Sequence, residues 1–175
     1  MIEHLLKSVI RDVPDFPEPG IVFKDITPIL QDPALCGAIV DSFVNRLTTG
    51  AIDVVAGIES RGFLFGLMLA QRLGKPFVPI RKQGKLPCRT IKQEYALEYG
   101  RATIEIHEDA FSPGARVLIH DDLLATGGTV VAASELIEQL GGQVAGYAFV
   151  IGLDFLKGHE RLARYSSSVV TLANY

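Results

Sequence analysis

A stretch of thirteen residues from Val117 to Thr129, VLIHDDLLATGGT, constrains the fold more than any other part of the chain. It places a short apolar run before two adjacent aspartates, and then a loop of small residues at the start of a helical pattern. Apolar runs and helical patterns alternate elsewhere in the chain as well, and such repeated units predict a parallel sheet with helices on both faces. We therefore expect an α/β fold.

Other patterns predict the remaining elements. Helical spacing, with Asp32 as N-cap and Pro33 at the first helical position, predicts a helix that reaches Leu47. Two alternating segments, 94–99 and 102–107, follow a polar stretch and predict a hairpin, here called the flap. The other expected elements are helices at 3–11, 62–73 and 129–140, strands at 54–58, 77–80, 117–119 and 144–151, and a constrained, extended proline-rich loop at 14–20.

Composition narrows the class of protein. With 175 residues, 48% of them hydrophobic and 21% charged, the chain is expected to form a single domain over residues 1–175, because no linker or repeat divides it. A net charge of −3 does not favour nucleic acid as a partner. The N-terminal sequence does not resemble an export signal, no apolar stretch approaches the ~20 residues of a membrane span, and the two cysteines suggest no disulfide framework. We expect a cytoplasmic protein without a membrane partner.

The residues after the apolar run suit a ribose 5-phosphate. In an open α/β sheet, ligands bind beyond the carboxyl ends of the strands, where Asp121 and Asp122 are expected to accept hydrogen bonds from sugar hydroxyls. The segment from Thr126 to Thr129 lies at the expected start of a helix, where unpaired N–H groups and the helix dipole favour a phosphate. The two glycines between these threonines allow the backbone to approach the phosphate oxygens.

The same stretch resembles the phosphoribosyl pyrophosphate signature of type I phosphoribosyltransferases. Further segments resemble the adenine phosphoribosyltransferase family within that group: FPEPGIVFKDITPIL at 16–30, GIESRGFLFG at 57–66, RKQGKLP at 81–87 and LEYG at 97–100. The resemblance implies a type I phosphoribosyltransferase-like fold with a flap hairpin and a short N-terminal hood segment. It also implies a homodimer that converts adenine and phosphoribosyl pyrophosphate to AMP and pyrophosphate.

This resemblance also implies which residues bind the base. Val22, Phe23 and Lys24 would line the base pocket, with Phe23 stacked on the purine and the backbone of Val22 reading its edge. Glu98 would lie beside the imidazole ring and manage its proton during catalysis, and Tyr99 would follow it at the end of the flap.

The phosphoribosyl pyrophosphate ligands are expected on three other segments. Backbone groups and the Arg61 guanidinium would meet the pyrophosphate, and the resemblance implies a strained, possibly cis, peptide between Glu59 and Ser60. Mg²⁺ would be held mainly by the substrate, so no protein metal site is expected. The full set of expected ligands is Ser60, Arg61, Arg81, Lys82, Lys85, Asp121, Asp122, Ala125, Thr126, Gly127, Gly128 and Thr129.

Three alternatives remain open at this stage. The acceptor could be another base, because the ribose phosphate site is shared among such enzymes. A regulator that binds phosphoribosyl pyrophosphate without catalysis would need a DNA-binding domain, which the chain does not supply. A kinase or a phosphatase is the third alternative, but the chain lacks the sequence motifs of both. His120 is interpreted as a tolerated strand position rather than a catalyst, and Cys88 is given no catalytic role.

Overall fold

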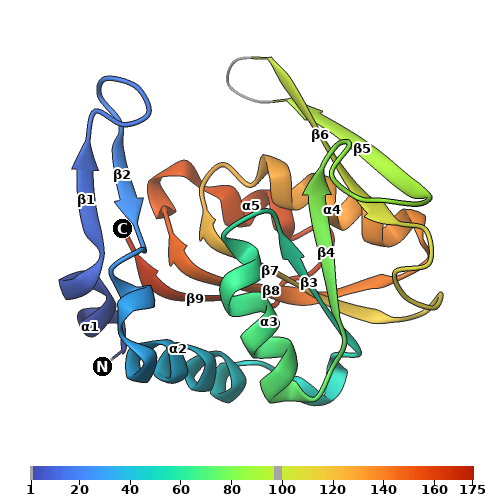
Figure 1. Cartoon of the computed structure of the whole chain (residues 1–175), viewed down its shortest axis with the longest axis horizontal. Coiled ribbons are helices and arrows are strands. Elements are labelled where there is room, and N and C mark those ends of the chain that lie inside the picture. Colours follow the sequence, from blue (N-terminus) through green and yellow to red (C-terminus); the bar gives the residue numbers. More distant parts are fainter. Residues whose placement is uncertain (1, 97–99) are drawn as a thin grey trace.

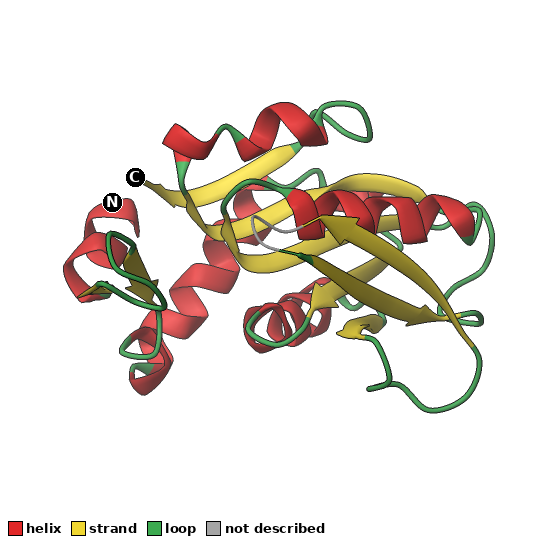
Figure 2. Cartoon of the chain, turned by 90° about the horizontal axis from the view of Figure 1, so that it is seen from above, coloured by secondary structure: helices red, strands yellow, loops and turns green. Residues whose placement is uncertain are grey.

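The protein is built on a seven-stranded sheet with helices on both faces, as the computed structural model of residues 2–96 and 100–175 describes it (Figures 1 and 2). The strand order is β5-β6-β4-β3-β7-β8-β9, and neighbours from β4 to β9 run parallel, while β6 is antiparallel to both β4 and β5. The strands are β3 (Val54–Ile58), β4 (Phe77–Lys82), β5 (Thr90–Ala96), β6 (Arg101–His107), β7 (Arg116–Leu124), β8 (Gln143–Gly152) and β9 (Val169–Asn174). The predicted α/β class is confirmed.

The helices bury one hydrophobic core on each face of the sheet. Successive residues of β7 contribute to opposite cores, because side chains alternate along a strand: Leu118 packs with one cluster, and Val117 and Ile119 pack with the other. The helices are α1 (Ile2–Val9), α2 (Pro33–Arg46), α3 (Gly62–Leu73), α4 (Gly128–Gln139) and α5 (Gly158–Leu162), with short 3-10 turns η1 (Ile29–Gln31), η2 (Thr49–Ala51) and η3 (Asp154–Leu156). No helix in the described ranges is long and apolar enough to cross a membrane.

Local signals account for several helix boundaries. The Asp32 side chain accepts hydrogen bonds from the N–H groups of Ala34 and Leu35, at 2.9 and 3.0 Å, so it caps α2 as predicted. The end of α3 is confirmed as well, since Gly74 closes it in the left-handed conformation with φ of 64°.

The N-terminal region differs from its prediction. The first helix ends at Val9 instead of Arg11, and the chain then forms β1 (Arg11–Pro14) and β2 (Val22–Asp25), an antiparallel pair separate from the main sheet. We call residues 11–25 the hood. The proline-rich loop is the connection between these strands, with a cis peptide between Phe16 and Pro17. The predicted constrained loop is therefore present, but the pairing of the residues that flank it was not predicted.

Several strands of the main sheet extend past their predicted bounds, and β5 and β7 do so most. The flap strand β5 begins at Thr90, inside the stretch expected to be a polar loop. Strand β7 continues past Ile119 to Leu124, paired with β8 along its length, whereas its last pair with β3 joins His120 to Gly57. The aspartate pair therefore lies within β7 rather than after it, but still beyond the carboxyl end of β3.

Candidate functional site

Most of the predicted site residues within the described ranges lie where β3, β4 and β7 end, and Val22, Phe23 and Lys24 lie on the hood. The hood lies on one side of this edge and the flap hairpin β5–β6 rises on the other (Figure 1). The start of α3 follows β3, and the loop that opens α4 follows β7. Segments far apart in the sequence thus meet at one edge of the sheet, as ligand sites of open α/β sheets do.

The aspartate pair provides buried carboxylate oxygens at this edge. Asp122 is 2% exposed, and its Oδ2 accepts no hydrogen bond within the described residues, although the Arg61 Nε atom lies 3.0 Å away. Asp121 Oδ1 accepts a hydrogen bond from the N–H of Asp122 at 2.9 Å. Burial raises the pKa of both carboxyls, the charge of Asp122 raises that of Asp121 further, and Arg61 opposes the rise at Asp122. A buried carboxylate that is paired with one guanidinium still has lone pairs that can accept a hydroxyl group.

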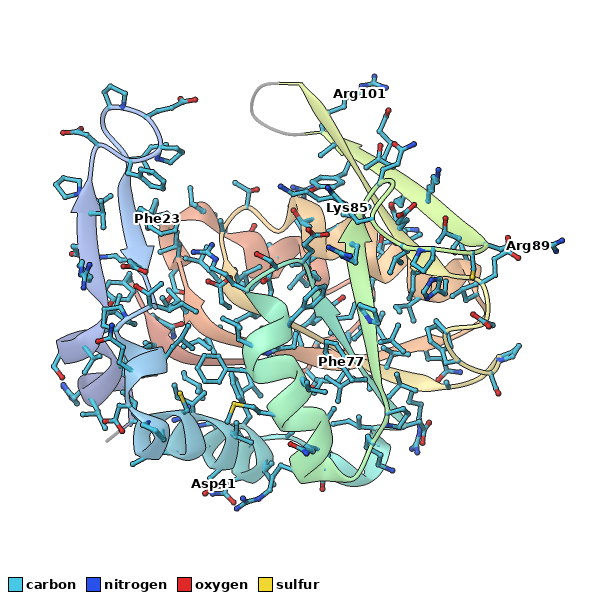
Figure 3. All side chains as sticks on the ribbon, in the orientation of Figure 1. Phe23, Asp41, Phe77, Lys85, Arg89 and Arg101 are labelled. Atoms are coloured by element: carbon cyan, nitrogen blue, oxygen red, sulfur yellow. The ribbon has the colours of Figure 1, made fainter. Side chains whose placement is uncertain are left out.

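Arg61 connects the aspartate pair with the hood. Its guanidinium carbon lies 4.9 Å from the centre of the Phe23 ring, and its Nε pairs with Asp122. Phe23 also meets Phe16 edge to face, with ring centres 5.2 Å apart, and it lies on the side of β2 toward the sheet (Figure 3). An aromatic face and a buried carboxylate therefore contact the same guanidinium group.

The neighbours of Phe23 do not point the same way. Lys24 Nζ pairs with Asp12 Oδ1 at 2.7 Å and lies 4.0 Å from the centre of the Tyr175 ring, so its side chain anchors the hood to the end of β9. This contact gives Lys24 a structural role that the sequence did not reveal. The Val22 side chain is half exposed, and its residue pairs with Pro14 across the hood.

The loop from Ala125 to Thr129, where a phosphate site is predicted, leads from β7 into α4. Gly127 has φ of 79°, a conformation that favours glycine, and it precedes α4 without any side-chain cap. Because Gly127 has no side chain, it does not cap the N–H groups in the first turn of α4. An anion site at the start of a helix requires such uncapped N–H groups. Gly128 is buried beneath the flap, where Ala96 lies within contact distance of it.

The start of α3 offers a second set of backbone donors. The Glu59–Ser60 peptide is cis, in agreement with the expectation. Arg61 precedes the helix without a side-chain capping bond, and hydrogen bonds from Phe63 to the Ser60 carbonyl close the first turn. Arg61 therefore lies beside the aspartate pair, and Ser60 precedes it in the chain.

The three cations of the expected basic cluster have different surroundings. Arg81 is engaged internally, because its Nε lies 3.1 Å from Glu59 Oε2 and its Nη1 donates to the Lys85 carbonyl at 2.8 Å. Lys82 uses its N–H to bind Glu59 Oε2 at 3.0 Å, while Lys85 lies near the end of β4 (Figure 3). Sequence alone did not separate the bracing role of Arg81 from the two lysines, since Glu59 is distant along the chain.

Other expected and unexpected residues complete the site. Glu98 and Tyr99 lie outside the described residues. Arg161 of α5 was not predicted, and its Nη1 donates to the Thr126 carbonyl at 3.2 Å, next to the phosphate loop. Only the position of α5 in space identifies it, because its surrounding sequence carries no motif. His120 is fully buried against Phe43, which agrees with its interpretation as a strand position.

The chain is similar to known proteins of one kind. Residues 26–173 match the phosphoribosyl transferase domain family. The adenine phosphoribosyltransferase of Cytophaga hutchinsonii is 56% identical over 175 residues, which are 100% of this chain and 97% of that protein. A crystal structure of adenine phosphoribosyltransferase from Thermoanaerobacter pseudethanolicus is 47% identical, with a TM-score of 0.95 over 100% of both chains. The enzyme from Saccharomyces cerevisiae, crystallised with adenine and an imino-altritol bisphosphate, is 44% identical, with a TM-score of 0.91 over 98% of both chains.

Proposed function

The chain belongs to the phosphoribosyl transferase family, and from this premise we propose that it is an adenine phosphoribosyltransferase. It transfers the 5-phosphoribosyl group of phosphoribosyl pyrophosphate to adenine and releases AMP and pyrophosphate, a reaction of purine salvage. The observation that carries this proposal is the buried Asp122 carboxylate, whose Oδ2 accepts no hydrogen bond from the described residues, on the same strand that leads into the Ala125–Thr129 loop. Sugar hydroxyls and a phosphate are matched by adjacent groups on one continuous segment.

Each group of the chain has a defined part in the reaction. The aspartates accept hydrogen bonds from the ribose hydroxyls, and the Ala125–Thr129 loop holds the 5-phosphate. The bond from ribose C1 to pyrophosphate breaks with its electron pair leaving on pyrophosphate, and the ribose acquires positive charge until N9 of adenine forms the new bond. Backbone N–H groups at Ser60 and Arg61, with the ammonium groups of Lys82 and Lys85, stabilise the departing negative charge. Phe23 holds the base by stacking.

We propose that Glu98 is the residue that takes up the proton of the adenine imidazole ring. Its carboxylate accepts this proton as N9 attacks, a role on the order of 10²- to 10⁴-fold in rate. Replacement of Glu98 by Ala and by Gln is expected to lower kcat by that factor while phosphoribosyl pyrophosphate still binds. Unchanged steady-state turnover in both variants would remove Glu98 from the mechanism.

Magnesium is the proposed cofactor, held mainly by oxygens of the substrate. The two aspartates are the oxygen donors that Mg²⁺ prefers, and the ion commonly takes one or two carboxylates together with substrate phosphates. No cluster of three or more His, Cys, Asp or Glu side chains exists within residues 2–96 and 100–175. When bound, Mg²⁺ withdraws charge from the pyrophosphate leaving group.

The direct test is an incubation with labelled adenine, phosphoribosyl pyrophosphate and Mg²⁺, with hypoxanthine and guanine in parallel. Formation of labelled AMP supports the proposal, and consumption of another base without adenine would contradict it.

Asp122→Asn should lower kcat/KM by roughly 10- to 100-fold, because a charged hydrogen bond of about 1.5–3 kcal/mol is weakened. Asp109→Asn, at an exposed turn residue, is the matched control and should leave kcat/KM unchanged.

We propose that the protein acts as a homodimer through the exposed side of α3. Leu64, Leu67 and Met68 are large apolar side chains on this helix that remain exposed, with Leu67 at 55%. Monomeric proteins rarely expose neighbouring apolar groups of this kind, and twofold dimers are the commonest assemblies. Leu67→Glu should convert the dimer to a monomer in light scattering, and a wild-type monomer would reject this surface.

Two further proposals concern the whole chain. A single domain predicts one cooperative unfolding transition in calorimetry, and two separate transitions would oppose it.

A cytoplasmic location fits the free cysteines, of which Cys88 is exposed and Cys36 is buried, because exposed thiols persist in reducing compartments. Cell fractionation tests the location.

A further inference from the structure

A buried glutamate on the flap holds the backbone that carries Lys85. Glu105 of β6 is 2% exposed, and it pairs across the sheet with Arg81 of β4. Its Oε1 accepts hydrogen bonds from the N–H groups of Lys85 and Leu86, both at 3.0 Å, and its Oε2 accepts one from the Thr90 hydroxyl at 3.2 Å. A single carboxylate therefore binds two consecutive amides of the loop that follows β4.

A second glutamate holds the other end of this loop. Glu59 Oε2 accepts the N–H of Lys82 at 3.0 Å and pairs with Arg81, whose Nη1 in turn donates to the Lys85 carbonyl at 2.8 Å. Lys85 is thus held on both sides of its α-carbon, at its N–H by Glu105 and at its carbonyl by Arg81. Its side chain therefore starts from a defined position near the end of β4.

The charge of Glu105 strengthens this arrangement. Burial alone would raise the pKa of its carboxyl, but the hydrogen bonds that it accepts, of which those from Leu86 and Lys85 count most, together outweigh burial and lower the pKa, so the group stays ionised. Hydrogen bonds from amides to an ionised carboxylate are roughly twice as strong as neutral ones. The loop is therefore fixed before any substrate arrives, which reduces the cost of ordering it on binding.

We propose that Glu105 is a positioning residue that presents Lys85 to the pyrophosphate group. The inference rests on the proposed function, and it adds a residue that touches no substrate atom. Glu105 acts through the Lys85 and Leu86 amides, so its effect should appear in phosphoribosyl pyrophosphate binding and should depend on the Lys85 side chain. A glutamate that only stabilises the flap would show neither property.

The test is a double-mutant cycle between Glu105 and Lys85. Glu105→Gln keeps the shape but removes the charge, and Glu105→Asp keeps the charge but shortens the reach to the amides. Each is expected to raise the KM for phosphoribosyl pyrophosphate about five- to tenfold, which corresponds to roughly 1–1.4 kcal/mol, with the KM for adenine changed less than about twofold. In a Lys85→Ala background the same substitutions should change the KM for phosphoribosyl pyrophosphate less than about twofold, because coupled residues are not additive.

Controls separate positioning from folding. Thr90→Val removes only the third hydrogen bond of Glu105, and its KM for phosphoribosyl pyrophosphate should stay within about twofold of the wild type. Calorimetric titration of each variant with Mg²⁺ and pyrophosphate provides a readout that needs no turnover. Should the Glu105 variants lose the same factor with and without Lys85, or lose thermal stability with unchanged pyrophosphate affinity, the inference is overturned. A wild-type protein that makes no AMP would instead overturn the proposed function.

Discussion

The phosphate loop and the hood are two halves of one site built in different ways. The Ala125–Thr129 loop continues a strand of nine residues that has strands on both sides, and it opens a helix of 12 residues. The hood has two strands of four residues in a sheet of their own, with Phe16 and Val22 about half exposed. In the proposed function, the ribose phosphate, which is common to all substrates of this kind, meets the core sheet. The base would meet a small attached hairpin, where changes in sequence disturb the core least.

The largest expected effect tests the rigidity of the phosphate side. Gly158→Ala would place a methyl group against the carbonyl oxygen of Ala125, a backbone atom that cannot move without displacing the loop. We expect kcat/KM for phosphoribosyl pyrophosphate to fall about 100-fold, because displacements on the order of 1 Å have such effects. Gly50→Ala, where an added methyl group meets nothing within 4 Å, is the control. Equal kinetics of the two variants would show that the phosphate side is as adaptable as the hood.

The next effect concerns the strand that carries the aspartates. Burial lowers the pKa of His120 from 6.5 to about 4, so the folded protein favours the neutral ring and the unfolded chain takes up the proton first as pH falls. The stabilising contribution is present above the unfolded pKa and is lost as pH falls toward the folded pKa, by about 2 kcal/mol between pH 7 and pH 5. Urea unfolding at several pH values should show this loss in the wild type relative to His120→Val. Parallel stability curves for the two proteins would contradict it.

A smaller effect should be confined to the hood. Phe23→Ala removes the stacking surface, which is worth about 1–3 kcal/mol per base, so the KM for adenine should rise roughly tenfold. The KM for phosphoribosyl pyrophosphate should remain within about twofold, and Phe155→Ala, at an exposed ring in η3, should change neither value. Equal increases in both KM values would mean that the two halves do not act separately.

The smallest effect tests how the hood is attached. The Tyr175 ring lies beneath two cations, with Lys24 Nζ 4.0 Å and Lys7 Nζ 5.1 Å from its centre. Each contact contributes about 0.5–1 kcal/mol, so Tyr175→Ala should raise the KM for adenine about threefold, whereas Tyr175→Phe keeps the ring and should retain the wild-type value. If the KM for phosphoribosyl pyrophosphate rose instead, the contact would support the phosphate loop and not the hood.

The same contrast separates what could be predicted from sequence. Helix α2 and the end of α3 were predictable because Asp32, Pro33 and Gly74 act within a few residues of their own positions. The strand, glycine-rich turn and helix around the Ala125–Thr129 loop were predictable for the same reason, since they are contiguous. The resemblance implied a hood segment, but its two strands were not predicted, because RDVP and VFKD lack the alternating apolar pattern of a strand and their pairing becomes visible only in space.

Side-chain partners were the least predictable part of the site. Arg81 and Lys85 look alike as neighbouring cations, and only the contact of Arg81 with Glu59, 22 positions away, distinguishes a brace from a free charge. Lys24 was assigned to the base pocket, yet it meets Tyr175 at the other end of the chain. Neither contact leaves a local pattern, so spacing along the chain could not reveal it.

Arg61 gives the two halves a shared component. Its guanidinium touches the hood through Phe23 and the sheet through Asp122, so a molecule that engages either partner alters what the other one meets. Thermodynamic reciprocity then applies: if bound phosphoribosyl pyrophosphate changes the affinity for adenine by some factor, adenine must change the affinity for phosphoribosyl pyrophosphate by the same factor. In the proposed function, this guanidinium group is therefore the part of the site through which the affinities for the two substrates would be coupled.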